Sequence, residues 1–243
     1  MSLMIVDLDA GNTRCKWRIV DDRNSVRKSG NSTLEQFCTV PFDEPEVWRV
    51  RVSSVRGLEA DAMIARWAVS NLGLNAEFAT ATRRLGQVVN GYADPEQLGV
   101  DRWLAILAGY DEVRGAVGII DCGSAMTADL VAKDGLHCGG FIAPGLAMMR
   151  QGLLRSTDKI RFDPSERSAG FVPGRDTGEA VCNGVLVAAT GFVTQAVERF
   201  REICGDPVIL MTGGDAELIQ QRLQFSTELR LSLVLDGLAL ALP

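Results

Sequence analysis

Histidine is almost absent from this chain, with a single residue, His137, among 243. A zinc site or a Ser-His-Asp triad would have to use that one side chain. Nothing near it in the sequence supports either site, and we interpret His137 as an ordinary strand residue. The six cysteines form no Cys-x-x-Cys pair, which also argues against zinc. Their apolar surroundings are typical of reduced cysteines in a cytosolic protein.

Positive charge is also scarce. Lys and Arg number 25 against 31 Asp and Glu, which gives a net charge of −6 and a pI near 5.0. Such a balance argues against nucleic acid or an anionic membrane as the main partner. The sequence has no signal peptide and no apolar run of about 18 residues, so we expect a cytoplasmic protein that does not span a membrane.

Three common motifs are missing as well. The chain has no GxxxxGK[ST] phosphate loop, no GxGxxG dinucleotide fingerprint and no GxSxG nucleophile elbow. Hydrophobic residues make up 47% of the chain and charged residues 23%, which is the balance of a soluble globular protein with an ample core.

One sequence pattern occurs twice, and the two copies are a little under half the chain apart. Residues 5–17 and 119–131 each contain an apolar run, then Asp-x-Gly with a small polar residue, then a second strand-like run. The aligned pairs are Asp9 with Asp121, Gly11 with Gly123, and Asn12 with Ser124. Two copies of one unit indicate a duplicated domain.

The order of the predicted elements agrees with a duplication. Each half opens with a β-hairpin and continues into helices, which favours two α/β domains with a cleft between them. We place the domains at residues 1–115 and 116–243. The main predicted elements are hairpins over 4–20 and 126–142, helices over 58–72, 95–113 and 178–203, and a strand over 231–235.

The repeated turn has a specific chemistry. The strand delivers a carboxylate to its end, and the glycine lets the backbone come close to a ligand. Two such turns facing each other would hold a polyphosphate, with the carboxylates binding its cation. The alternative is two ordinary hairpin turns with Asp and Gly in their usual places.

Polar residues also interrupt the start of the helix predicted over 95–113, for which Asp94 is the N-cap and Pro95 the first residue. Asp101 could accept a proton from a substrate hydroxyl, and Arg102 could hold an anionic group. The alternative is a solvated helix face with capping. Glycines in 139–145 and 212–215 suggest close approach of backbone to a ligand, or simply tight connections.

With these motifs in hand, the chain resembles the type III pantothenate kinase family, also described as the Bvg accessory factor family. The resemblance runs nearly end to end. It rests on 9–16 (DAGNTRCK), 90–92 (NGY), 99–105 (GVDRWLA), 121–124 (DCGS), 139–145 (GGFIAPG), 177–180 (TGEA) and 212–215 (TGGD). No single motif is decisive, but their order and spacing are specific.

The resemblance implies a fold and an activity. The fold would be two duplicated ribonuclease-H-like domains of the actin, hexokinase and acetate kinase superfamily, with an interdomain cleft. The activity would be phosphorylation of pantothenate by ATP with Mg²⁺, the first step of coenzyme A biosynthesis. A monovalent cation, K⁺ or NH₄⁺, would be required, and the protein would be a homodimer.

The resemblance also implies roles for individual residues. The residues contacting ATP phosphates would be Asp9, Ala10, Gly11, Asn12, Thr13, Arg14, Cys15, Lys16 and Ser124. The residues lining the pantothenate pocket would be Tyr92, Gly99, Val100, Asp101, Arg102 and Thr177, the last in one version from the partner subunit. Asp101 would accept the proton, and Asp121 would hold the monovalent cation. At Ser124 the family usually has threonine, so the hydroxyl is kept.

The sequence leaves two other hypotheses on the function open. One is a non-catalytic transcriptional accessory protein of the same family, against which the low pI and the lack of a basic helix argue. The other is a different small-molecule kinase or phosphatase of the superfamily, which substrate profiling would separate.

Overall fold

The computed structural model describes residues 3–39, 47–156 and 170–243. The chain forms two compact units: unit 1 comprises Met1–Glu112 and Ser232–Pro243, and unit 2 comprises Val113–Leu231. The boundary expected at residues 115 and 116 thus differs by three residues. The C-terminal segment Ser232–Pro243, expected in the second domain, groups with unit 1.

Unit 1 is built on a five-stranded sheet with the order β3-β2-β1-β4-β5. Its strands are β1 (Met4–Ala10), β2 (Cys15–Asp21), β3 (Val26–Ser32), β4 (Val47–Ser54) and β5 (Ala76–Phe78). The first three are antiparallel neighbours, whereas β4 runs parallel to β1 and β5 parallel to β4.

Unit 2 repeats this sheet, with the order β10-β9-β8-β11-β12. Its strands are β8 (Val117–Cys122), β9 (Ala125–Val131), β10 (His137–Pro144), β11 (Val208–Thr212) and β12 (Glu228–Leu229). The strand directions also repeat, because β8, β9 and β10 are antiparallel neighbours and β11 and β12 are parallel additions. The duplication predicted from the two Asp-x-Gly turns is therefore confirmed.

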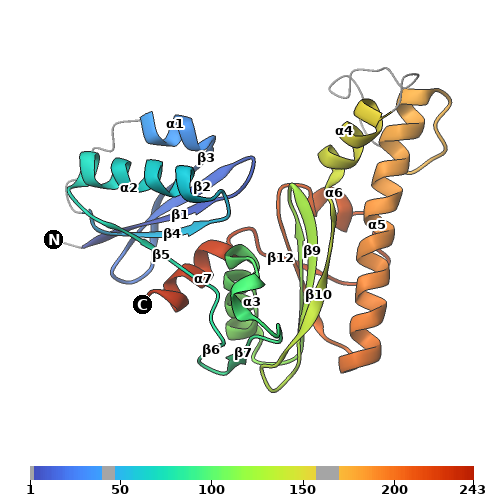
Figure 1. The fold of residues 1–243 in the computed structure, drawn as a ribbon. Coiled ribbons are helices and arrows are strands. Elements are labelled where there is room, and N and C mark those ends of the chain that lie inside the picture. Colours follow the sequence, from blue (N-terminus) through green and yellow to red (C-terminus); the bar gives the residue numbers. More distant parts are fainter. Residues whose placement is uncertain (1–2, 40–46, 157–169) are drawn as a thin grey trace. The chain divides into compact units, whose positions relative to one another are not determined.

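Helices complete both units (Figure 1). Those of unit 1 are α1 (Leu34–Thr39), α2 (Leu58–Leu72), α3 (Val100–Val113) and α7 (Leu233–Ala241). Those of unit 2 are α4 (Leu146–Ser156), α5 (Thr177–Cys204) and α6 (Ala216–Gln220). A 3₁₀ turn, η1 (Pro95–Gln97), precedes α3, and a short ribbon, β6 (Arg84–Leu85) with β7 (Val88–Val89), precedes η1.

The two faces of the unit 1 sheet differ in character. Alternate residues of β1, namely Val6, Leu8 and Ala10, are fully buried in an apolar core with residues of α1 and α2. The helix α7 packs on β1 and β4 (Figure 1). The Asp7 side chain, also fully buried, lies on the face opposite to that apolar core. Successive side chains of a strand point to opposite faces, so one strand serves both layers.

Asp7 is paired with two arginines from neighbouring strands. Arg18 Nε donates to its carboxylate over 2.9 Å, and Arg51 Nε does so over 2.7 Å. The same arginines reach α7 and the C-terminus, since Arg18 donates to the Leu235 carbonyl over 2.7 Å and Arg51 to the Leu242 carbonyl over 3.1 Å. This cluster ties the end of the chain to the first strand.

The core of unit 2 gathers around α5, whose buried residues pack with those of β8, β9 and β11. By length and mean hydropathy, 1.6 over its most apolar window, α5 could cross a membrane, but 56% of that window is buried inside the protein. One such helix is weak evidence for a membrane span, because the core helix of a soluble protein has the same length and hydropathy.

Two predicted elements differ from the structure. The helix expected over 95–113 is interrupted, because Leu98 is extended (φ −77°, ψ 124°) and separates η1 from α3. Asp94 does cap η1, accepting from Glu96 N over 3.1 Å. The strand expected over 231–235 is wrong: α7 begins at Leu233, and the last strand lies earlier, at Glu228–Leu229.

Candidate functional site

The first Asp-x-Gly turn lies at the end of β1, the central strand of its sheet. Asp9 is partly buried. In the register of the sheet it lies opposite Lys16 on β2 and opposite Ser53 on β4. Ser53 is a residue that our sequence analysis missed. Its hydroxyl is buried beside Asp9 and has no hydrogen-bond partner among the described residues. A Cβ at Gly11 would lie 3.1 Å from the Arg14 carbonyl oxygen, so this tight turn favours glycine.

The residues expected to bind ATP in this turn present different groups. The side chains of Ala10 and Cys15 are fully buried in the core, so only their main-chain atoms can reach a ligand. Burial, reinforced by Asp9, raises the pKa of the Cys15 thiol to about 12, which makes it inert. Asn12, Thr13 and Arg14 are exposed, so their side chains can reach a ligand.

The second turn lies at the same place in unit 2. Asp121, on the central strand β8, pairs with Thr127 on β9 and with Thr212 on β11. The hydroxyl residue Thr212 occupies the sheet position that Ser53 holds beside Asp9. Ser124 follows in the connection to β9, and its carbonyl accepts from Gly145 N over 3.0 Å. The end of the Gly-rich segment 139–145 thus packs against the turn.

The segment after β11 closes over this turn. Gly213 has a φ of +95°, and a Cβ there would meet the Cys122 backbone and lie 2.5 Å from Asp121 Oδ1. Asp215 N donates to the Cys122 carbonyl over 3.0 Å. Partial burial raises the pKa of Asp215, and Arg150 opposes that shift. The two carboxylates, Asp121 and Asp215, also raise the pKa of the Cys122 thiol, after burial as the main cause.

A third group forms at the start of α3 in unit 1. Asp101 Oδ1 accepts from Arg102 N over 2.8 Å, and a Cβ on Gly99 would lie 2.6 Å from that oxygen. Glycine at position 99 therefore leaves the space that the carboxylate occupies. The buried Arg102 donates to Tyr92 Oη over 2.9 Å and lies 5.6 Å from the ring centroid. The structure thus brings Tyr92, Asp101 and Arg102 together.

Two residues without a predicted role hold Tyr92 in place. The buried Asn90 accepts from Tyr92 N over 3.0 Å through its side-chain oxygen. Arg83 donates to the carbonyls of Tyr92 and Ala93 over 2.7 and 2.6 Å. The supporting role of Asn90 could be predicted from its Asn-Gly-Tyr motif. The role of Arg83 could not, because its acceptors are main-chain carbonyls, which any residue type provides.

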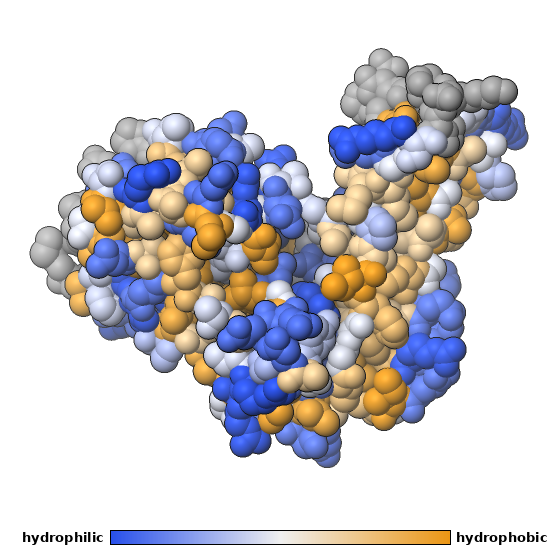
Figure 2. Space-filling model, viewed as in Figure 1, coloured by the Kyte–Doolittle hydropathy of each residue, from blue (hydrophilic) through white to orange (hydrophobic). Residues whose placement is uncertain are grey.

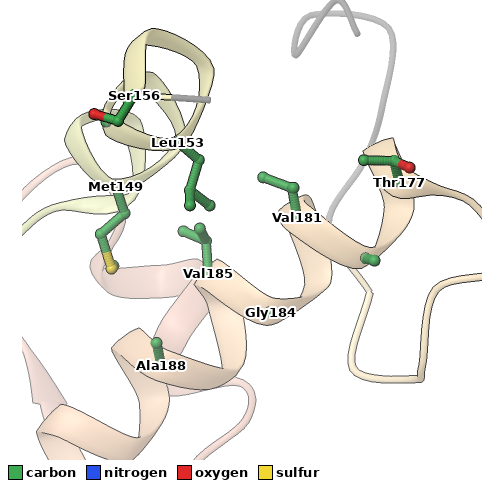
Figure 3. A pocket seen from close by; sticks show the side chains of 10 residues that line it. Met149, Leu153, Ser156, Thr177, Val181, Gly184, Val185 and Ala188 are labelled. Carbon is green, nitrogen blue, oxygen red and sulfur yellow. The ribbon is translucent and has the colours of Figure 1, made fainter. Parts of the chain in front are cut away.

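Thr177 lies apart from these groups, exposed on the first turn of α5. It borders a pocket of about 820 Å³ between α4 and α5. Leu153 of α4 and Val185 of α5 point toward each other there, and Thr177 lies at the pocket's end (Figure 3). Apart from Ser156, the other lining side chains, such as Met149 and Val181, are also apolar, so this pocket does not suit a phosphate.

The predicted residues thus form four groups, each described within its own unit. Unit 1 holds the Asp9 turn and the Tyr92–Asp101–Arg102 group, and unit 2 holds the Asp121 turn and Thr177. Across residues 3–39, 47–156 and 170–243, no cluster of three or more His, Cys, Asp or Glu side chains suits a metal ion. Mg²⁺ commonly needs only one or two carboxylates besides phosphate oxygens, so the Asp9 and Asp121 turns still fit it.

His137 takes no part in these groups. It is buried at the start of β10, and its Nε2 lies 3.0 Å from Asp129 Oδ1 on the neighbouring strand. The prediction of a strand residue is confirmed.

Two copies of one sheet, each with Asp-x-Gly at the end of its central strand, define a protein of the duplicated ribonuclease-H-like class. A family model described as type III pantothenate kinase matches residues 5–199. Proteins named type III pantothenate kinase from Pseudomonas fluorescens (strain SBW25) and Azotobacter vinelandii (strain DJ) are 39% and 38% identical. Each comparison covers 99% of this chain and 99% of the relative. The chain therefore belongs to the type III pantothenate kinase family.

Solved structures support the fold. A Campylobacter jejuni protein described as a conserved Baf family transcriptional activator has a TM-score of 0.61 at 18% identity, covering 96% of this chain and 95% of its own. The ethanolamine utilization protein EutJ of Carboxydothermus hydrogenoformans has a TM-score of 0.54 at 14% identity, covering 98% and 89%. At such identities the likeness shows the fold alone.

Proposed function

We propose that this protein transfers the γ-phosphoryl group of ATP to pantothenate, giving 4′-phosphopantothenate, the first step of coenzyme A biosynthesis. The observation that carries the proposal is the repeated Asp-x-Gly turn at one position of two equivalent sheets. A kinase of this family needs ATP and a divalent metal ion, and the two turns offer carboxylates, hydroxyls and main-chain amides of the required kinds.

The nucleotide is assigned to Asp9–Lys16 and Ser124. In the first turn, Ala10 and Cys15 contribute main-chain groups, while Asn12, Thr13 and Arg14 extend polar side chains into solvent. Lys16 lies opposite Asp9 and supplies a positive charge for phosphate. Bound Mg²⁺ would neutralise charge on the phosphate oxygens.

The acceptor is assigned to Tyr92 and residues 99–102. Arg102, held by Tyr92, offers a fixed guanidinium for the pantothenate carboxylate. Asp101 takes the proton of the primary hydroxyl, and that hydroxyl oxygen attacks the γ-phosphorus in line. The main-chain amide of Arg102 orients the Asp101 carboxylate while it does so.

A monovalent cation is assigned to Asp121. The chain has no phosphate-loop lysine, so K⁺ or NH₄⁺ would supply part of the positive charge that phosphoryl transfer requires. The carboxylate lies beside the paired residues Thr127 and Thr212, whose hydroxyl and carbonyl oxygens are hard ligands of the kind such ions take.

A coupled assay of ADP release tests the assigned substrate and the assigned monovalent cation. With Mg²⁺ and K⁺, ADP should form only when pantothenate is present, and mass spectrometry should identify 4′-phosphopantothenate. Replacing K⁺ by Na⁺ should abolish turnover. Activity on a sugar but not on pantothenate would contradict the assigned substrate, whereas equal rates in Na⁺ and K⁺ would contradict only the role of Asp121.

We also assign a homodimer in the cytoplasm, with Thr177 near pantothenate. Support comes from the apolar pocket between α4 and α5 and from exposed apolar side chains over β10 and these helices (Figure 2), since large exposed apolar patches mark interfaces. Light scattering should give twice the chain mass. Leu153→Glu puts a charge into the apolar pocket and should yield monomers. The control Leu136→Glu, at an exposed hairpin, should still form dimers. A monomeric wild-type protein would rule the dimer out.

A further inference from the structure

Two cysteines from distant parts of unit 2 meet at its surface. Cys138 is an exposed residue of β10, and Cys204, partly buried, is the last residue of α5. The two thiols are neighbours, and the Cys204 thiol contributes to raising the pKa of Cys138. The Cys138 thiol also lies 3.5 Å from the Leu136 carbonyl oxygen, so its sulfur is held near the start of the strand.

A β-bulge accounts for the orientation of Cys138. The pairing of β10 with β9 shifts between His137 and Gly139, which leaves Cys138 as the extra residue. Gly139 has a φ of +101°, a conformation that glycine adopts easily. Because the bulge takes Cys138 out of the regular alternation of the strand, its side chain can reach the neighbouring helix.

An aromatic contact fixes the helix over the strand. The rings of Phe141 on β10 and Phe200 on α5 stack with centroids 6.3 Å apart and planes 16° apart. Phe200 is buried and precedes Cys204 by about one helical turn. The last turn of α5 is therefore anchored beside the bulge, independently of the thiol contact.

We propose that Cys138 and Cys204 form a redox-active pair, which a small disulfide such as oxidised glutathione converts reversibly into an intramolecular disulfide. The Cys138 thiolate attacks the small disulfide, forms a mixed disulfide and releases one glutathione thiolate. The Cys204 thiolate then attacks the Cys138 sulfur and releases the second glutathione thiolate. Two protein thiols lose their protons and two electrons, and one glutathione disulfide becomes two thiols.

The other cysteines differ in accessibility. Cys15, Cys122 and Cys182 are buried, and burial raises the pKa of both Cys15 and Cys122 to about 12, which suppresses their thiolates. Cys38 is partly buried, and its cysteine neighbour is the fully buried Cys15. Among the described residues, the pair at positions 138 and 204 is thus the one that combines an exposed thiol with a neighbouring thiol.

The exposed thiol reacts more readily at alkaline pH. Partial burial, followed by the neighbouring Cys204 thiol, raises the pKa of Cys138 above its ordinary value. The thiolate fraction therefore grows as the pH rises through the alkaline range, and so does the rate of exchange. Oxidation is best measured at mildly alkaline pH.

Disulfide mapping on the intact native protein tests the proposal. The reduced protein is incubated with oxidised glutathione, its remaining thiols are alkylated under denaturing conditions, and its peptides are analysed by mass spectrometry. The expected result is a cross-link between the peptides of Cys138 and Cys204, with two fewer alkylated thiols, both restored by dithiothreitol. Free thiols or separate glutathione adducts at both positions, or a cross-link of Cys15 with Cys38 alone, would overturn it.

Variants give a second measurement. Cys204→Ser should accumulate a stable glutathione adduct at Cys138, because no resolving thiol is left. The matched control Cys38→Ser should form the same cross-link as the wild-type protein. If Cys204→Ser collects no adduct while the wild-type protein is cross-linked, Cys138 is not the attacking thiol and the proposed order of steps is wrong.

Discussion

At the scale of single residues, the structure separates side chains that can contact a ligand from those that cannot. Ala10 and Cys15 lie inside a motif that resembles the family along its whole length, yet their side chains are in the core. The sequence predicts the motif correctly because its spacing is local. It does not separate main-chain from side-chain roles, because these depend on which face of β1 and β2 is buried.

Asp101→Asn should lower kcat by about 10²- to 10⁴-fold, the usual contribution of a general base. The asparagine oxygen can still accept from Arg102 N, so α3 should keep its first turn. Nucleotide affinity and melting temperature should therefore stay close to wild type. Turnover, ATP binding and thermal melting on one preparation measure all three.

The control for this variant is Asp111→Asn, on the exposed side of the same helix. It should leave kcat within about twofold, because ten residues, or about 15 Å of helix, separate this exposed carboxylate from Asp101. Near-normal turnover of Asp101→Asn would remove this carboxylate from the mechanism.

Gly213→Ala should damage the second turn. The added Cβ would require a strained φ and would collide with Asp121 and the Cys122 backbone. We expect a loss of about 2–4 kcal/mol in the free energy of unfolding, with a weakened response to K⁺ in the remaining folded protein.

The adjacent Gly214 is a matched control, since a Cβ there meets no atom within 4 Å. Gly214→Ala should change the free energy of unfolding by no more than about 0.5 kcal/mol. Urea titrations of both variants measure the difference. Equal effects would mean that the close approach of Gly213 to Asp121 has no energetic weight.

At the scale of elements, local patterns predict most of the fold. The helix predicted over 58–72 matches α2 residue for residue, because its apolar spacing and its terminal Gly73 are both local signals. The failure over 231–235 has a long-range cause. Leu233 and Leu235 fit either a strand or a helix by pattern. The helix is selected by its partners, such as Leu104, whose backbone leaves no room for a Cβ at Gly237.

The buried charge cluster under α7 should be sensitive to loss of Asp7, its fully buried carboxylate. The second carboxylate of the cluster, Asp236, pairs with Arg18, but its side chain is 41% exposed. Asp7→Asn would leave Arg18 and Arg51 buried with a neutral partner, at a cost of about 3–5 kcal/mol in the free energy of unfolding. Urea unfolding, followed by tryptophan fluorescence, measures this cost.

The exposed ion pair between Arg199 and Glu202 on α5 is the comparison. Both side chains are more than half exposed, so Glu202→Gln should cost less than about 0.5 kcal/mol. A similarly small cost for Asp7→Asn would show that the arginines find other acceptors, such as the carbonyls of Leu235 and Leu242.

At the scale of the whole molecule, the duplication could be read from two short turns, and the repeated strand order confirms it. The return of the C-terminus to unit 1 could not be predicted in this way. It depends on Arg18 reaching α7, and Arg51 the residue after α7, across most of the length of the chain. Contacts between residues so distant in sequence leave no periodic signal.

That return predicts an unequal effect of truncation. Removing Ser232–Pro243 strips the cover from the Asp7 cluster and deletes the apolar side chains that α7 buries in unit 1, such as Leu233 and Leu238. At about 1.5–3 kcal/mol for each large apolar side chain, unit 1 should lose on the order of 6 kcal/mol or more. Unit 2 contains none of the removed residues, so its stability should change little.

Two optical probes distinguish the units. The chain has four tryptophans, Trp17, Trp48, Trp67 and Trp103, and all of them belong to unit 1. The long helix α5 belongs to unit 2 and contributes strongly to the far-ultraviolet circular dichroism. In the truncated protein, the fluorescence transition should move to much lower urea, while a large part of the dichroism signal persists to the wild-type midpoint. A single common transition for both probes would mean that unit 2 depends on unit 1 for its stability, which would contradict their independence.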